Sequence, residues 1–187
     1  TELIRALTTD QVAALTTAQV ASLSSVQVSA LTTSGIVALT SADVAALSSA
    51  QARALATDQM AALETGDLRA LSTTALRSLG TEQVNALGSD QVAALTTAQV
   101  AALTSVQLAN LSSTNLNALN SAQFGVLNSA QVAAMSSAQV AALGTETIAD
   151  QQRVADAFSR INLIPKPLRV SDIVWLPPQG NATAPKK

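Results

Sequence analysis

The side chains of this sequence that could carry chemistry are rows of hydroxyl and amide groups and a few scattered charges. The chain has no His and no Cys, so the most common nucleophile–base pairs and zinc sites lack the residues to form them. Its carboxylates show no paired spacing that suggests acid–base catalysis, and no glycine-rich phosphate loop occurs. We therefore predict no catalytic, cofactor-binding or metal-binding residues, no cofactor, and a protein that is not an enzyme.

The hydroxyl groups recur with a strict period. Ser or Thr stands at one position in every eight, from Thr9 to Thr145, and Gln follows two residues later in most copies. An ordered hydroxyl row could match an ice or sugar lattice. A hydroxyl before a helix also accepts a backbone amide hydrogen, which explains the row without a ligand. We favour helix capping over ligand binding.

Charged residues gather in the middle of the chain. Arg53, Arg69 and Arg77 occupy the same position of the eight-residue unit, so we expect them to line one side. Three acidic residues lie near them in the sequence: Asp58, Glu64 and Asp67. These charges could form a docking strip for a protein partner. A solvated surface with weak ion pairs is the simpler interpretation, and we favour it.

Asparagine is concentrated in a later stretch. Its members are Asn110, Asn115, Asn117, Asn120 and Asn128, with Phe124 among them. They could form a polar ladder or a small recognition patch. We favour tolerated variation on the surface, with Phe124 as a larger core residue.

The elements that must position these groups are set by an eight-residue repeat, called the octad below. Leu begins each octad from Leu7 to Leu143, except that Met135 takes one place. Five residues after it comes a second apolar residue, usually Val, from Val12 to Ile148. No insertion or deletion interrupts this register, so the chain is a tandem repeat.

A single long helix is excluded by geometry. Eight residues overshoot two helical turns by roughly 80°, so the Leu stripe would wind around the rod. A β-solenoid with a turn in each octad stays open as an alternative. However, the helix-forming Ala-Ala-Leu and Gln and the scarcity of Gly favour helices.

We therefore predict one short helix in each octad. The hydroxyl two residues after Leu can cap it; alternatively, the hydroxyl one residue after Leu caps it and Gln completes a capping box. Such short helices are marginal alone and must stack on their neighbours. The predicted fold is an all-α solenoid with Leu and Val inside, Ser and Thr at caps, and the residue three after Leu outside. The number of octads in one turn of the superhelix, called a coil below, stays open.

Glycine departs from the pattern at Gly35, Gly80 and Gly88. Ser34-Gly35 replaces the usual x-Gln, which should loosen the start of that helix. Gly80 and Gly88 follow a leucine, where we expect them to ease the turn.

Composition limits the partners. The net charge is −2, which gives no basic surface for nucleic acid, and no apolar run is long enough to cross a membrane. We expect a protein partner, or self-association through the open ends of the solenoid. Leu3 and Ile4 could cover one such end.

We divide the chain into three parts. Residues 1–149 are the octad solenoid, and residues 150–176 are a C-terminal helix, over 151–161, with an extended segment rich in Pro. Residues 177–187 are predicted to be a disordered tail.

The octad, as in Leu95-Thr96-Thr97-Ala98-Gln99-Val100, resembles tandem repeats of large bacterial proteins labelled adhesins or haem-utilisation proteins. The resemblance implies a bacterial surface repeat. It does not carry haem binding to this chain, which has no His, Tyr or Cys and offers only Met60 and Met135 as sulfur ligands.

A second resemblance covers about thirty residues. Residues 149–158, 163–167 and 172–175 are similar to the extreme C-terminus of aliphatic-sulfonate-binding proteins, periplasmic components of bacterial ABC importers. It implies an exported protein and a fused or recombined gene, and it carries over no ligand residue.

From these observations we expect a structural or interaction module, namely a spacer, stalk or adhesive scaffold, that is secreted, periplasmic or on a bacterial surface. The alternative is a remnant or fusion related to a sulfonate-binding protein.

Overall fold

The computed structural model describes residues 1–143, 152, 155–156 and 159–160. Residues 1–143 form eighteen short helices, and none of the described residues lies in a strand, so the predicted all-α solenoid is confirmed and the β-solenoid is wrong. The helices are α1 (Glu2–Arg5), α2 (Thr9–Ala13), α3 (Thr17–Ser22), α4 (Ser25–Ser29), α5 (Thr33–Val37), α6 (Ser41–Ala45), α7 (Ser49–Ala54), α8 (Thr57–Ala62), α9 (Thr65–Ala70), α10 (Thr73–Ser78), α11 (Thr81–Asn85), α12 (Ser89–Ala94), α13 (Thr97–Ala102), α14 (Ser105–Ala109), α15 (Ser113–Asn117), α16 (Ser121–Gly125), α17 (Ser129–Ala133) and α18 (Ser137–Leu143).

The residue that follows Leu caps each helix from α2 to α17, and the helix begins at the next residue. In α13, Thr96 has extended backbone angles, and its Oγ1 accepts the amide hydrogen of Gln99 over 3.1 Å. The Gln99 Oε1 accepts the Thr96 amide hydrogen in return, over 2.9 Å. This is a capping box, which satisfies two amides that the helix itself leaves unpaired. The register with the cap one residue after Leu is therefore correct, and the cap two residues after Leu is wrong.

Each helix ends where the next Leu turns the chain. The Leu103 amide donates to the Val100 carbonyl over 3.2 Å, and the Leu103 backbone is extended at φ −55° and ψ 140°. The extended backbone of Thr104 follows and caps α14. Because extended residues interrupt the helical backbone at this step, no helix within residues 1–143 exceeds the seven residues of α18.

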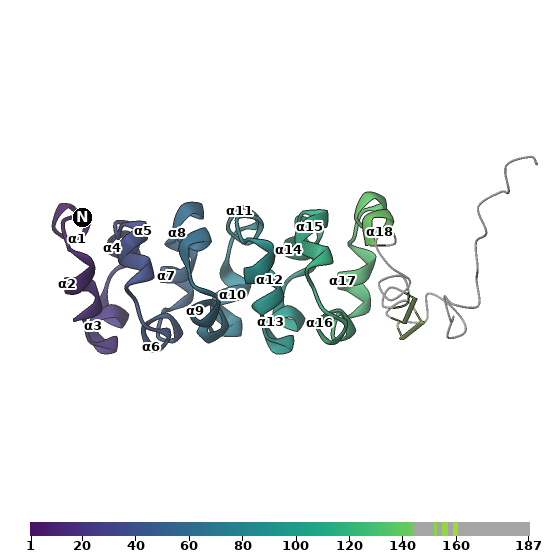
Figure 1. Ribbon diagram of the computed structural model, residues 1–187, viewed down its shortest axis with the longest axis horizontal. Coiled ribbons are helices and arrows are strands. Elements are labelled where there is room, and N and C mark those ends of the chain that lie inside the picture. The colour runs from purple at the N-terminus through teal and green to yellow at the C-terminus, as the bar shows by residue number, and fades with distance from the viewer. Residues whose placement is uncertain (144–151, 153–154, 157–158, 161–187) are drawn as a thin grey trace, which may run out of the picture.

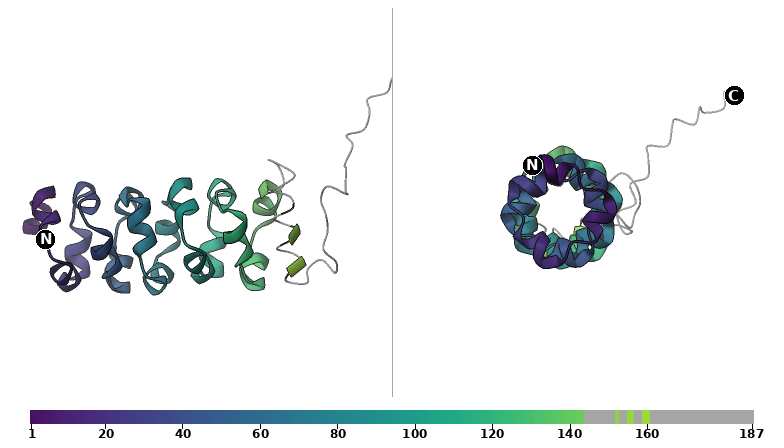
Figure 2. Two further views of the ribbon diagram at one scale, coloured as in Figure 1. Left: turned by 60° about the horizontal axis from the view of Figure 1, so that its bottom comes forward. Right: turned by 90° about the vertical axis from the view of Figure 1, so that its left-hand side faces the viewer.

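The helices wind into a tube whose coils stack along one axis (Figures 1 and 2). Helices three apart in order pack together, as α4 does with α7 and α7 with α10. Viewed along the axis, the described helices form a ring (Figure 2, right). The chain thus returns to the same side of the tube after between three and four octads. The sequence does not reveal this number, because the octads are nearly identical.

The Leu and Val positions form one continuous core, as predicted. Val100 is 0% exposed and Leu95 is 5% exposed, whereas Ala98, three residues after Leu, is exposed. At the N-terminal end Ile4 packs against the core, but Leu3 is 85% exposed and covers nothing.

The C-terminal prediction is tested only in part. Residues 152, 155–156 and 159–160 are helical, in agreement with a helix over 151–161. The remaining residues of that segment, the extended segment to 176 and the tail 177–187 lie outside the described residues, as do the boundaries placed at 149 and 176.

Candidate functional site

The Gln row, which the sequence analysis did not place inside, is the most ordered polar feature of the tube. Nine of these side chains are buried although they are polar: Gln51, Gln59, Gln83, Gln91, Gln99, Gln107, Gln123, Gln131 and Gln139. Each comes from the third position of its helix, where the capping box holds the side chain in a fixed orientation.

The buried amide joins one coil to the previous one. Gln99 Nε2 donates to the carbonyl of Leu68 over 2.8 Å and to that of Leu71 over 2.8 Å, 31 and 28 residues earlier. Its Oε1 already accepts from Thr96. Gln91 repeats the pattern on Met60 and Leu63. All hydrogen-bonding atoms of the side chain are thus used by the fold, and none is left for a ligand.

In the first coil, the Gln side chains form capping boxes but are not seen to bond to the carbonyls of another coil among the described residues. Gln11 and Gln19 are exposed and Gln27 is half-buried, and each forms only the capping bonds of its own helix.

Two octads carry Asp in the Gln position, and there the hydrogen bond between coils joins a different pair of groups. A carboxylate has no hydrogen to donate to a carbonyl. Asp43 Oδ1 instead accepts the Thr17 hydroxyl over 2.8 Å, and Asp67 Oδ1 accepts the Ser41 hydroxyl over 2.6 Å. Both donors lie 26 residues earlier, so a coil-to-coil contact survives with donor and acceptor exchanged.

Asp43 is ionised more readily than an ordinary carboxyl group. Burial raises its pKa, but the hydroxyl and amide of Thr40 and the hydroxyl of Thr17 lower it by more, so the pKa lies below its usual value. These hydrogen bonds explain the shift as part of the fold, without any catalytic role.

Three of the Asn residues, Asn110, Asn120 and Asn128, are exposed, in agreement with surface variation, whereas Asn115 is buried. Asn120 and Asn128 cap α16 and α17. Asn115 is buried in the Gln position and, being one methylene shorter, is bonded only to the Leu87 carbonyl, over 2.7 Å. Phe124 is 2% exposed, which confirms the predicted larger core residue.

The glycine predictions are correct only in part. Gly35 lacks a side chain to complete the capping box, yet its amide still donates to Thr32 Oγ1 over 3.0 Å, so α5 keeps its first cap. Gly80 and Gly88 have φ of −71° and −74°, which any residue adopts. They replace the capping hydroxyl and do not ease the turn.

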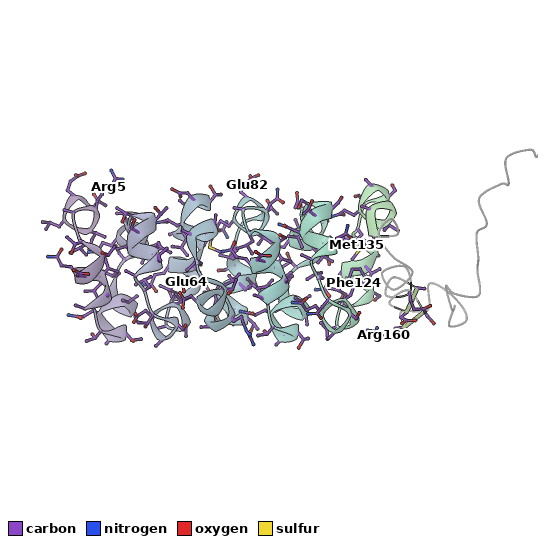
Figure 3. All side chains as sticks on the ribbon, in the orientation of Figure 1. Arg5, Glu64, Glu82, Phe124, Met135 and Arg160 are labelled. Carbon is purple, nitrogen blue, oxygen red and sulfur yellow. The ribbon has the colours of Figure 1, made fainter. Side chains whose placement is uncertain are left out.

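The three arginines do not share one side. All are exposed, and Arg53 and Arg77 lie on α7 and α10, which pack together. Arg69 lies on α9, which packs against α6 and α12. Figure 3 shows the side chains of the described residues spread along the tube, with Arg5, Glu64 and Glu82 well separated.

The sulfur atoms are inaccessible to a large ligand. Met60 is 0% exposed and Met135 is 9% exposed, because they occupy the Val and Leu positions of their octads. Residues 1–143 and the described positions beyond them hold no cluster of three or more His, Cys, Asp or Glu that could bind a metal ion. No helix in this part of the chain has the length and hydrophobicity needed to cross a membrane.

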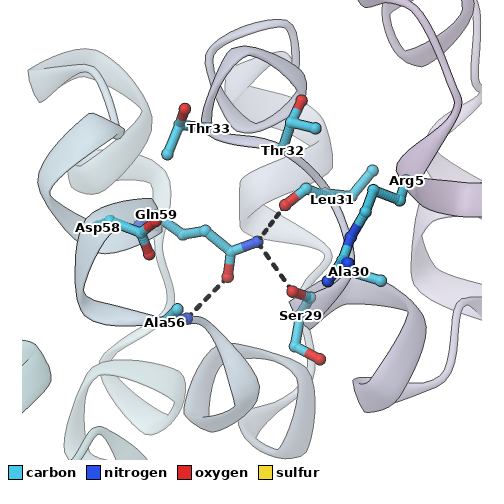
Figure 4. A pocket seen from close by; sticks show the side chains of 9 residues that line it. All are labelled: Arg5, Ser29, Ala30, Leu31, Thr32, Thr33, Ala56, Asp58 and Gln59. Carbon is cyan, nitrogen blue, oxygen red and sulfur yellow. Dashed lines mark hydrogen bonds between the residues drawn. The ribbon is translucent and has the colours of Figure 1, made fainter.

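One pocket of about 240 Å³ is lined by Arg5 of α1, by residues 29–33 at the turn between α4 and α5, and by residues 56, 58 and 59 at the start of α8 (Figure 4). Its charged residues are Arg5 and Asp58, which have opposite signs. Gln59 lines it too, but its side-chain Nε2 donates to the Leu31 carbonyl over 2.6 Å. Asp58 Oδ1 accepts the backbone amide hydrogen of Gln59 over 2.9 Å. The pocket is a seam between coils and indicates no ligand class.

A family model described as the ALTTAQ repeat matches residues 1–25, 28–65, 60–97, 100–136 and 118–150. The chain belongs to the ALTTAQ repeat family. The matches end at residue 150, close to the predicted end of the octads at 149. Comparisons with curated proteins and with solved structures gave no match. The ALTTAQ repeats therefore account for the tube, while the resemblances to adhesins and sulfonate-binding proteins stay predictions from the sequence.

A sequence signal for the buried Gln row exists. The ALTTAQ position that Gln occupies also holds Gly35, Asp43, Asp67, Ala75, Asn115 and Thr147, but never Lys, Arg or Glu. Exposed positions of the same repeat do hold long charged residues, such as Arg53 and Glu82. The absence of long charged side chains at one register position indicates that the position is enclosed.

Proposed function

We propose that this chain is a non-catalytic structural module, a spacer or scaffold in an exported or surface protein of a bacterium. The observation that carries the proposal is the Gln bridge, which joins each coil to the previous one by buried hydrogen bonds. Among the described residues, no buried side-chain nitrogen or oxygen lacks a hydrogen-bond partner. The interior polar groups thus hold the tube together, which suits a passive mechanical role. The bacterial and surface part of the proposal comes from the resemblance of the octad alone.

A spacer must hold its ends at a defined separation. Because the chain has no Cys, spin labels can be attached at Ala18→Cys and Ala138→Cys, two exposed positions in distant coils. Pulsed dipolar spectroscopy on label-diluted samples should give a narrow distance distribution that lengthens by equal steps as octads are inserted between the labels. The same chain in urea is the control for a flexible tether. A distribution as broad as that of the urea sample would refute the spacer role.

A further inference from the structure

The fold leaves one row of hydroxyl groups without a role. Ser or Thr stands two residues after Leu in every octad, from Thr9 to Thr145, but the helix caps lie one residue earlier. Within residues 9–137 every member of this row, called the outer hydroxyl row below, is exposed or half-buried. The hydroxyls of the row that form hydrogen bonds within residues 1–143 are those of Thr17 and Ser41. Capping therefore does not explain the row.

The outer hydroxyl row varies less than the side chains that do have a structural role. The capping position loses its hydroxyl in some octads, where it holds Ala56, Glu64 or Gly80. The first position of a helix is favourable for Ala, Asp, Glu and Pro, yet none of these occurs in the row. Ser and Thr replace each other freely there. What every octad keeps is thus the hydroxyl group and not the methyl group.

A second, independent feature is the absence of charge on the later coils. Residues 91–143 contain no Lys, Arg, Asp or Glu. The exposed side chains that the structure describes there are those of Ser, Thr, Asn, Ala and Val, and Val106 is 63% exposed. A surface without charge gives little protection against aggregation. A large, neutral and hydrophilic group attached to the hydroxyls would supply the hydration that this surface lacks.

The members of the row lie on all sides of the tube, because the octads that carry them wind around its axis (Figure 2, right). A flat lattice, such as ice or a crystalline sugar, would contact one side only and would not require a hydroxyl in every octad. A group attached covalently to each hydroxyl has no such restriction. The distribution of the row therefore favours attachment over lattice binding.

Charge distinguishes two kinds of group that attach to hydroxyls. A phosphate carries a charge of about −1.5 to −2 near neutral pH and is stabilised by nearby Arg. Residues 91–143 offer no Arg or Lys, so a row of phosphates there would repel one another without compensation. A neutral sugar avoids this repulsion, and its own hydroxyl groups are well hydrated.

We propose that the outer hydroxyl row accepts O-linked sugars, transferred from a nucleoside diphosphate sugar by a separate glycosyltransferase. The Ser or Thr oxygen forms a glycosidic bond to the anomeric carbon, and the bond from that carbon to the nucleoside diphosphate breaks. The diphosphate leaves with the electron pair, and the hydroxyl proton passes to a base of the transferase. This inference rests on the proposed scaffold role and deepens it, since the tube then holds sugars at regular intervals.

Mass spectrometry of the chain isolated from the cells that produce it tests the proposal. The intact mass should exceed the 19.0 kDa of the sequence by multiples of a monosaccharide residue. Ser72, Thr73 and Thr74 are three consecutive exposed hydroxyl residues, of which only Thr73 belongs to the row. Fragmentation by electron transfer should place the sugar on Thr73 alone. An unmodified mass, phosphate in place of sugar, or sugars spread equally over the three residues overturns the proposal.

A pair of matched variants separates an acceptor from a structural residue. The double variant Thr33→Ala, Thr73→Ala removes two exposed members of the row, and Ser34→Ala, Thr74→Ala removes their exposed neighbours. Made in a host without the transferase, both should melt at the temperature of the wild-type chain. Made in the original cells, the first should lose the sugars of two sites and the second should lose none. A lower melting temperature for the first variant alone would assign the row to the fold and overturn the proposal. The spacer measurement on the sugar-free chain is unaffected by either result.

Discussion

At the scale of single residues, the tube depends on a side chain that performs two tasks at once. The oxygen of Gln99 closes a capping box on its own helix, and its nitrogen binds two carbonyls of the previous coil. A buried amide with all its partners is favourable, whereas the same site with a partner missing carries the full desolvation cost. This explains why the Gln position holds short residues, such as Asp and Asn with one contact or Ala75 with no polar group, but no long charged residue.

Two helices of nearly identical sequence test this double role. Gln99→Glu places a carboxylate against the Leu68 and Leu71 carbonyls and should lower the free energy of unfolding by roughly 2–4 kcal/mol. Gln19→Glu, in the same Thr-Thr-Ala-Gln-Val context but exposed, keeps its capping box and should change it by less than about 0.5 kcal/mol. Urea unfolding followed by circular dichroism measures both. Equal losses would show that the buried bridge contributes nothing.

Asp43 makes a pH-dependent contribution to the free energy of unfolding, and the lowered pKa gives its sign. Its pKa is lowered in the folded chain, so its stabilisation is complete above the unfolded pKa of about 3.9 and is lost as the pH falls through the lower folded value. The stability difference between the wild-type chain and Asp43→Asn should therefore be largest near pH 6 and shrink below about pH 4. Urea titrations at several pH values measure it. A difference that stays constant with pH would contradict the assigned hydrogen bonds.

At the scale of the element, the capping residue and the residue after it have separate roles. The hydroxyl one residue after Leu caps the helix but is replaced by Ala56, Glu64 and Gly80 in some octads. The hydroxyl two residues after Leu is present in every octad, and from α2 to α18 it stands at the first helical position. Helix propensity and capping therefore determine where each helix starts. Packing of Leu and Val supplies the stability that such a short helix lacks alone.

Neighbouring threonines distinguish the two roles. Thr96→Ala removes the acceptor for the Gln99 amide and should cost about 1 kcal/mol of unfolding free energy. Thr97→Ala leaves the cap intact and improves helix propensity, so it should be neutral or slightly stabilising. Thermal unfolding of the two variants decides between them. A larger loss of stability from Thr97→Ala than from Thr96→Ala would show that the helix is capped two residues after Leu.

The core contribution of an octad is tested in the same way. Leu95→Asp buries a charge without a partner and should cost several kcal/mol, about 3 or more. Ala98→Asp adds the same charge at an exposed position near a helix start, where an acidic residue is tolerated. Similar melting temperatures for the two variants would mean that the assigned interior is wrong.

At the scale of the whole molecule, stability is a sum over octads and over contacts between coils, as in other solenoids. Since the octads are nearly interchangeable, the register of eight matters more than the identity of any one unit. Removal of residues 96–103 deletes one octad and should preserve the helical circular dichroism, with a fall of a few degrees in melting temperature. Removal of residues 96–99 breaks the register and should abolish cooperative unfolding. Tolerance of the half-octad deletion would contradict the coil-by-coil account.

The sequence predicts the local structure better than the long-range contacts. The spacing of Leu, Val and the hydroxyl residues indicates helices, caps and core, because those depend on neighbours within one octad. The partners of Gln99, 28 and 31 residues away, depend on how many octads complete a coil, and identical units contain no mark of that number. Asp43 and Asn115 likewise look like surface variation until the enclosure of their position is known.

The central claim is that buried Gln amides hold successive coils together, and nuclear magnetic resonance of those side chains tests it most directly. The Nε2 protons of Gln99 should exchange slowly with solvent and show cross-relaxation with protons of Leu68 and Leu71. The Nε2 protons of Gln19 should exchange at the rate of a free amide. Rapid exchange at Gln99, with no cross-peaks to residues about one coil earlier, would contradict the account.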